Sequence, residues 1–335
     1  MIIKKLLLTI ILFSSQSAIY GQIKSTTAVK KSPIKNVEYD STKNFMGEDV
    51  YAYIGQALYL KGDHRKEAYR GFVLNYTDGS ENDNTYLPSN SNGYSIARGS
   101  DYEAMAKKYF RVLDVVPHPK QDERSYYEDK YFLKLRDLKN RKNLYYEYDA
   151  GSYYSFPFIT VGYYEKSNAS CKGQKYILNR LHSSTFFHTP SISRKKQVDV
   201  LTGDEVTSSI GDVWECQGIT IWEDNDHDLA YELKNDKGQI ILVSYNIYEP
   251  SHGIYTIEER DYYEEKFGAE NFNLVLSGII KVGMTEEMVT FSIGPPKSIN
   301  KSETGNLSYD QWVYSSERYL YFTNGELDTI QGDWN

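Results

Sequence analysis

The chain has 335 residues, of which 25% are charged, and its formal net charge is −8. This acidic balance argues against a nucleic-acid backbone or an anionic membrane surface as partner. The length predicts two or three folded domains. Tyrosine occurs 32 times. Because tyrosine favours strands and carries one polar tip on a large apolar ring, we expect a mostly β protein with an exposed aromatic surface.

Residues 1–21 have the pattern of a secretory signal peptide. Lys4 and Lys5 form a basic start, residues 6–13 are apolar except for one threonine, and small residues precede Gln22. The apolar stretch is shorter than the roughly 20 residues that a membrane span needs. No cysteine stands at the cleavage point, and no later run is apolar enough to span a membrane. We therefore expect an exported protein, periplasmic or extracellular, that is not a lipoprotein and has no transmembrane span.

Two small β modules are predicted after a flexible leader at residues 22–44. The first spans 45–165 and contains an Asn- and Ser-rich insertion, and the second spans 170–250. In each, a strand is followed by a polar spacer and a hairpin, and the run from Val198 to Asp204 echoes the one that begins at Val50. These similarities indicate a possible duplication. The expected strands lie at 57–60, 109–116, 131–135, 144–148 and 213–221, with a hairpin over 229–243.

The chain contains two cysteines, Cys171 and Cys216. In an exported chain such a pair favours a disulfide. The closed loop would be long, so the bond could stabilise the fold by on the order of 4 kcal/mol. The alternative is two buried free thiols, because Cys216 lies in the apolar run 213–216 and buried cysteine is common.

Other polar groups give weak signals for a site. His182 and His188 bracket a short run, but their spacing fits neither one helix face nor one strand face. Acidic clusters at 78–83 and 224–228 lack the ligand spacing of a calcium loop, and we interpret them as solvated connections rather than calcium sites. The common nucleophile, zinc, phosphate and dinucleotide motifs are absent. We therefore expect no enzyme, no cofactor and no metal.

The C-terminal part, residues 257–335, is predicted to pair helices with a sheet. The window 258–276 is helical in pattern, although Gly268 can break it into two. A short helix follows, with Thr285 as its N-cap and Gly294 before two prolines as its end. Three strands are then expected at 312–314, 319–322 and 327–330, with the dipeptide Asn324-Gly325 as a hairpin turn.

These C-terminal motifs resemble a known family. The runs Gly283-Met284-Thr285-Glu286-Glu287, Ile293-Gly294-Pro295-Pro296, Gln311-Trp312-Val313-Tyr314 and Tyr319 to Leu327 are similar to those of the SmpA/OmlA (outer-membrane assembly factor BamE-like) family. The resemblance covers Ile257 to Gln331. It implies two helices packed on a three-stranded antiparallel sheet, a fold that β-lactamase-inhibitory proteins share. The family's lipid-anchor cysteine is not matched here.

The strand at 319–322 offers a candidate binding surface. Its alternation directs Leu320 and Phe322 towards the helices and Tyr319 and Tyr321 to the opposite side of the sheet. Exposed tyrosines suit protein recognition, whereas the plainer interpretation is that this side covers the upstream modules. The expected cross-strand pairs are Phe322 with Leu327 and Leu320 with Thr329.

Taken together, the sequence favours an exported, non-catalytic binding or scaffold protein of the cell envelope. It would hold an envelope protein or a glycan through β-sheet surfaces. An exported hydrolase or enzyme inhibitor with a site in the upstream modules is one alternative, and an adaptor for outer-membrane assembly is another. A buried cluster of carboxylates or histidines in a cleft would favour the enzyme.

Overall fold

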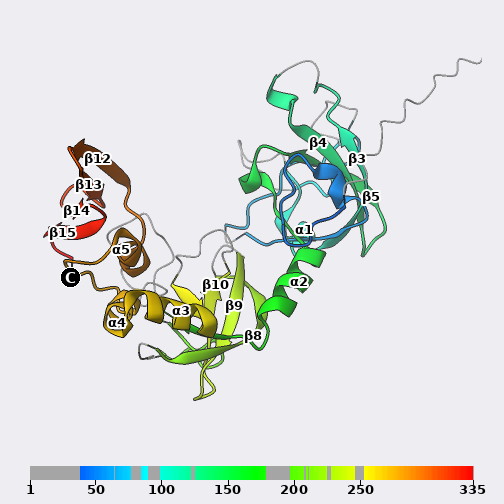
Figure 1. Cartoon of the computed structure of the whole chain (residues 1–335). Coiled ribbons are helices and arrows are strands. Elements are labelled where there is room, and N and C mark those ends of the chain that lie inside the picture. The colour runs from blue at the N-terminus through cyan, green and yellow to red at the C-terminus, as the bar shows by residue number, and fades with distance from the viewer. Residues whose placement is uncertain are drawn as a thin grey trace, which may run out of the picture. The chain divides into compact units, whose positions relative to one another are not determined.

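The computed structural model of the chain describes residues 38–334, apart from 64, 77–83, 90–98, 122–124, 179–196, 207, 208, 210, 225–227 and 246–252. Within these residues the fold is mostly β, with three antiparallel sheets and few helices, as expected (Figure 1). The signal peptide, its cleavage point and most of the leader lie outside the described residues. No helix in the described part of the chain is both long and apolar enough to cross a membrane.

The first sheet has the strand order β2-β5-β4-β3-β1-β6. The strands predicted around 57–60, 109–116 and the hairpin over 131–148 are confirmed, and two short strands join them. A short helix, α1 (Tyr102–Met105), precedes β3. The strands are β1 (Ala57–Leu60), β2 (Phe72–Val73), β3 (Tyr109–Pro117), β4 (Lys130–Asp137), β5 (Asn143–Asp149) and β6 (Phe158–Thr160).

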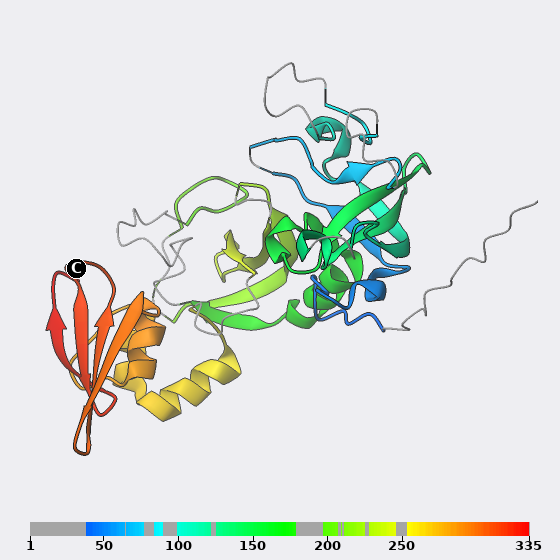
Figure 2. The same cartoon turned by 90° about the horizontal axis from the view of Figure 1, so that it is seen from above.

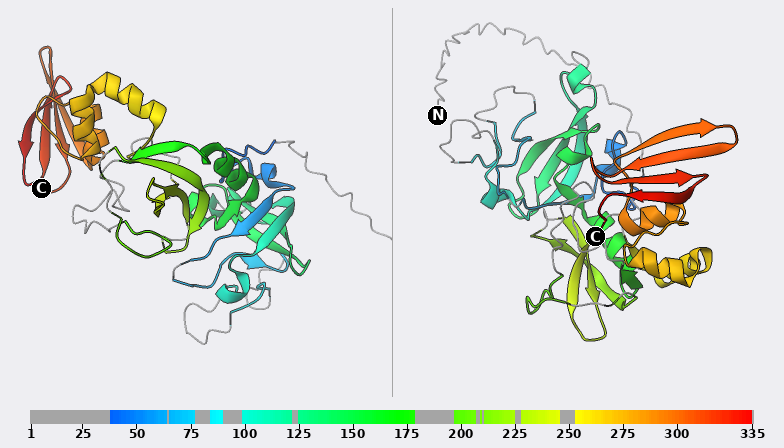
Figure 3. Two further views of the ribbon diagram at one scale, coloured as in Figure 1. Left: turned by 90° about the horizontal axis from the view of Figure 1, so that it is seen from below. Right: turned by 90° about the vertical axis from the view of Figure 1, so that its left-hand side faces the viewer.

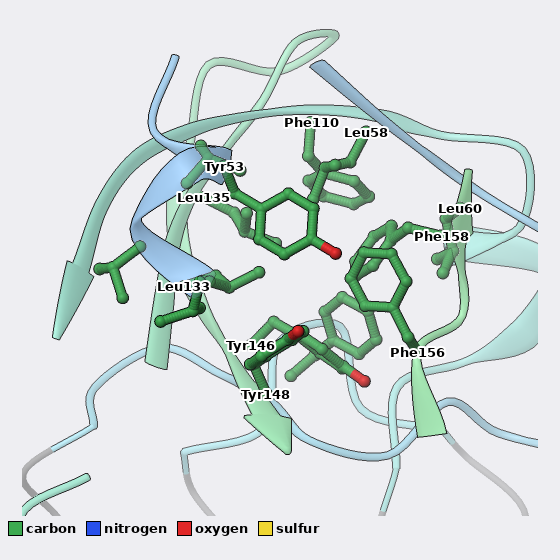
Figure 4. Packing of buried hydrophobic residues seen from close by; sticks show 14 of the residues in the cluster. Tyr53, Leu58, Leu60, Phe110, Leu133, Leu135, Tyr146, Tyr148, Phe156 and Phe158 are labelled. Atoms are coloured by element: carbon green, nitrogen blue, oxygen red, sulfur yellow. The ribbon is translucent and has the colours of Figure 1, made fainter. Parts of the chain in front are cut away.

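Aromatic rings fill the core of this first sheet, as Figure 4 shows. Tyr53 stacks on Phe156 with ring centroids 5.3 Å apart, and Tyr146 meets Phe158 edge-on at 5.1 Å. The predicted exposed aromatic surface therefore accounts for only some of the tyrosines, because many of them are buried. Buried polar groups need hydrogen-bond partners, and several of the tyrosine hydroxyls have them. Those of Tyr53, Tyr146 and Tyr148 donate to the backbone carbonyls of Asn44, Ser155 and Gly47.

The second sheet has the order β10-β9-β8-β7-β11. It contains the strand predicted at 213–221 and the hairpin predicted over 229–243. Its last strand lies beyond residue 250, where the second module was expected to end. The strands are β7 (Lys175–Leu178), β8 (Val213–Trp222), β9 (Asp228–Lys234), β10 (Ile240–Ser244) and β11 (Ile254–Thr256).

The two sheets repeat one topology. The order β5-β4-β3-β1-β6 in the first matches β10-β9-β8-β7-β11 in the second. Each has a register shift at the same place, after Val112 in β3 and after Cys216 in β8. Each last strand ends on a threonine that begins an eleven-residue helix: Thr160 precedes α2 (Val161–Cys171), and Thr256 precedes α3 (Ile257–Phe267). The described structure thus has the duplicated architecture that the sequence suggested.

The starts of the two modules also match in their hydrogen bonds. The Gly55 N–H donates to the Val112 carbonyl at 2.9 Å, as the Gly173 N–H does to Cys216 at 2.8 Å. The backbone carbonyls of the following residues, Gln56 and Gln174, accept from the N–H groups of Val112 and Cys216. The predicted match between the runs that begin at Val50 and Val198 is therefore wrong. The first run precedes β1, whereas the second lies between β7 and β8. The repeated signal is Gly-Gln followed by an apolar strand.

Two helices of the C-terminal module, α4 (Ala269–Leu276) and α5 (Glu286–Ile293), cover one face of its sheet, as Figures 2 and 3 show. Gly268, at φ 79°, separates α3 from α4, so the predicted break is correct. The Thr285 hydroxyl caps α5 by accepting from the Met288 N–H at 3.3 Å. The sheet has four strands rather than three: β12 (Ser298–Thr304), β13 (Leu307–Val313), β14 (Tyr319–Thr323) and β15 (Glu326–Gln331).

Candidate functional site

The predicted alternation of β14 is confirmed. Leu320 and Phe322 are 0% and 1% exposed and belong to the hydrophobic cluster with α4 and α5, whereas Tyr319 and Tyr321 are half-buried on the other side. Phe322 pairs with Leu327 as expected. The other expected pair is wrong, because a bulge in β15 shifts the register by one residue. Leu320 therefore lies opposite Ile330, and Thr329 lies opposite Tyr321.

Tyr321 belongs to a row of side-chain hydrogen bonds that crosses all four strands. The Asn300 amide donates to the Gln311 side-chain oxygen at 2.9 Å. The Gln311 amide donates to the Tyr321 hydroxyl at 3.1 Å, and this hydroxyl donates to the Gln331 side-chain oxygen at 2.7 Å. We call these four residues the polar row. Each member fixes the next, so the side chains are held in place before any partner arrives.

The sheet face that carries the polar row is almost free of charge. We call it the outer face. The strand pairing assigns its positions, and all except Glu326 are uncharged. They are Ser298, Asn300, Ser302, Thr304, Leu307, Tyr309, Gln311, Val313, Tyr319, Tyr321, Thr323, Glu326, Thr329 and Gln331. For a chain in which a quarter of the residues are charged, this is a distinct surface.

Lys301, Glu303 and Asp310 lie on the opposite side of the sheet, towards the helices. Asp310 is 5% exposed and accepts from the Lys301 ammonium at 2.7 Å. Burial raises the pKa of Glu286, at the start of α5, and the nearby charge of Asp310 raises it further. The sheet thus separates a charged helix side from a neutral outer face. The outer face offers hydrogen-bonding groups and aromatic rings.

Cys171 and Cys216 lie next to each other. Cys171 ends α2 and Cys216 lies in β8, both are buried, and their Sγ atoms are 3.4 Å apart without a bond. Two polar contacts hold α2 on β8 beside them. The Ile219 N–H donates to the Asn168 side-chain oxygen at 2.8 Å, and the Tyr164 hydroxyl donates to the Ile219 carbonyl at 2.7 Å.

The remaining sequence candidates do not assemble into a site within the described residues. His182, His188 and the cluster at 78–83 lie outside them. In the cluster at 224–228, Asp228 pairs with the Lys61 ammonium at 2.9 Å. Among the described residues, no group of three or more His, Cys, Asp or Glu side chains could hold a metal ion.

One aromatic cluster on the first sheet was missed by sequence reasoning. His118 stacks on Tyr127 with centroids 4.2 Å apart and on Phe132 at 5.2 Å. The Lys130 ammonium lies 3.8 Å from the Tyr126 ring centroid and 3.0 Å from a Glu147 carboxylate oxygen. The residues of this cluster are spread between positions 118 and 147, so no local sequence pattern predicts that they lie together.

We predict that His118 makes stability depend on pH. Burial lowers its pKa, the charges of Lys120 and Lys130 lower it further, and Glu147 opposes them. Because the folded pKa lies below the unfolded value of about 6.5, this contribution is present above that pH and is lost as pH falls through the folded pKa. In melting curves the wild type should therefore lose stability relative to His118→Phe, which keeps the stacking but cannot be protonated, as pH falls below about 6.5. Parallel pH profiles would contradict the prediction.

No protein-family model matches the chain, and neither the curated proteins nor the solved structures contain a match to it.

Proposed function

We propose that this protein is an exported, non-catalytic binding or scaffold protein of the cell envelope, and that the outer face of its C-terminal sheet holds a protein partner. The observation that carries the proposal is the polar row with Tyr319 and Tyr321 on a neutral face. Tyrosine with Ser and Asn is the composition that recognition surfaces use. The ring supplies contact area at low entropic cost, and the small polar groups adapt their hydrogen bonds.

Two features favour a protein as the partner. A neutral face avoids the cost of desolvating charges in the centre of an interface, where charged residues are depleted. The sheet also ends at β12, whose seven residues are all exposed. An extended segment of a partner could pair with this edge and lay alternate side chains on the outer face. A glycan could use the same rings and amides but not the strand edge, so it is an outcome of the test.

The signal-peptide pattern of residues 1–21 supports this proposal, because it predicts that the protein is exported. The resemblance of Ile257 to Gln331 to the SmpA/OmlA family points to the same compartment. Membership of that family is part of the proposal, as is the envelope location.

We predict that Tyr319→Ser together with Tyr321→Ser abolishes partner binding and leaves the fold intact. In cells, a photo-reactive phenylalanine at position 319 should cross-link to a protein. The same group at position 154, where Tyr154 is 97% exposed, is the matched control and should give no such product. Tyr321→Phe should weaken binding less than Tyr321→Ser, because it keeps the ring and removes only the two hydrogen bonds of the hydroxyl.

Two results would contradict the proposal. Equal cross-linking at positions 319 and 154 would show that the outer face has no partner. A product at position 319 that glycosidases remove and proteases leave intact would assign the face to a glycan instead of a protein.

A further inference from the structure

The first module shows which residues correspond to Cys171 and Cys216, because the backbone hydrogen bonds of the two modules match residue by residue at this point. The Gln174 N–H donates to the Cys171 carbonyl at 3.0 Å, just as the Gln56 N–H donates to Tyr53 at 2.9 Å. The hydrogen bonds of Val112 and Cys216 match in the same way. Cys171 therefore takes the place of Tyr53, and Cys216 takes the place of Val112.

The first module fills this place with bulky apolar groups. Tyr53 and Val112 are 0% and 1% exposed within an aromatic core. Cysteine side chains are much smaller than tyrosine, so the second module buries less apolar surface at the junction of its helix and sheet. Among the described residues, its cluster of buried hydrophobic side chains is also the smaller of the two. A covalent bond is a recognised means of stabilising a small core.

We infer that Cys171 and Cys216 form a disulfide in an oxidising medium, and that this bond fastens the C-terminal end of α2 to β8. The Sγ atoms are 3.4 Å apart and need only approach to about 2.05 Å. Each sulfur gives up its proton, and one S–S bond forms. The two electrons pass to a disulfide of the glutathione or protein dithiol class, which is reduced to two thiols.

The position indicates a structural bond rather than a reactive one. Cys171 and Cys216 are 3% and 1% exposed and share a cluster with Tyr176, Tyr231 and Tyr245. Exposed, low-pKa thiols are the ones that take part in catalysis and sensing. A reductant has no direct access here, so the bond should form during folding and then persist.

The full-length chain, refolded in a glutathione redox buffer, tests the inference. It is then denatured without reductant in N-ethylmaleimide, and its intact mass is measured. We expect no maleimide adduct before reduction and two adducts after it. Wild type refolded with reductant present should melt several degrees below wild type refolded in the redox buffer, whereas the double variant Cys171→Ala, Cys216→Ala should melt at the same temperature after either treatment.

Two adducts on the unreduced chain would overturn the inference. So would a disulfide-linked dimer on a non-reducing gel, because it would show that the cysteines react between molecules. An equal response of wild type and double variant to reductant would contradict the stabilising role.

Discussion

Phe322→Ala should destabilise the C-terminal module by roughly 3–5 kcal/mol, and Leu320→Ala by roughly 2–5 kcal/mol. Both side chains are almost completely buried, and the Phe322 ring lies 4.5 Å from that of Trp312. Truncation removes apolar contacts and leaves a cavity between the sheet and α5. Hydrogen exchange of peptides from β13 to β15 in the full-length chain measures the local free energy of opening.

The matched controls are Tyr319→Ser and Tyr321→Ser on the same strand. They should cost much less, because their rings are half-buried and the cavity term is absent. The comparison decides between two interpretations of the outer face. If the tyrosine variants lose as much protection from exchange as Phe322→Ala, the outer face is part of the core, and a binding surface there is ruled out.

Local chemistry explains which parts of this module were predictable. Thr285 caps α5, Gly294 ends it at φ 84°, and the turn Asn324-Gly325 adopts positive φ at both residues. Each of these signals acts over a few residues, and each was read correctly. The same holds for strands in which apolar and polar residues alternate, such as β4 and β5.

The missed features depend on contacts between distant residues. The sequence of β12, residues 298–304, lacks an apolar alternation because none of its residues is buried, and pairing with β13 alone makes it a strand. The bulge at Asp328 shifts the cross-strand partners of Tyr319, Leu320 and Tyr321 by one residue and leaves no local signature. As a result, Tyr321 was recognised, whereas its partners in the polar row were not.

The hairpins predict the repeat correctly, whereas the similarity between the runs at Val50 and Val198 misplaces its start. Hairpins keep their register because short turns fix it. The first strand of each module, β1 or β7, is separated from the next matching strand, β3 or β8, by a linker of different length. Only a short motif next to the first strand can therefore identify the start of the module. The dipeptides Gly55-Gln56 and Gly173-Gln174 are that motif, and the hydrogen bonds of the two modules give it a physical basis.

Lys108→Met should destabilise the first module by about 3 kcal/mol or more, because it leaves a buried carboxylate without its cation. The Asp137 side chain is 0% exposed and pairs with Lys108. Burial alone would raise the pKa of Asp137, but hydrogen bonds from Lys108 and from the N–H groups of Asn140 and Lys139 bring it below its ordinary value. The pair thus contributes stability above an unfolded pKa of about 3.9 and loses it as pH falls through the folded value.

The pH dependence separates loss of the ion pair from loss of packing. In Lys108→Met the pKa of Asp137 should rise, so the variant should approach the wild type in stability as pH falls and the carboxyl becomes neutral. Asp137→Asn added to Lys108→Met should recover part of the loss at neutral pH, because the amide needs no cation.

Lys134→Met, on the outer side of β4, is the matched control and should change stability by less than about 1 kcal/mol. Hydrogen exchange of peptides from β4 and β5 gives the local stability. A cost for Lys108→Met that is independent of pH, or one no larger than that of Lys134→Met, would show that Lys108 does not balance the buried charge.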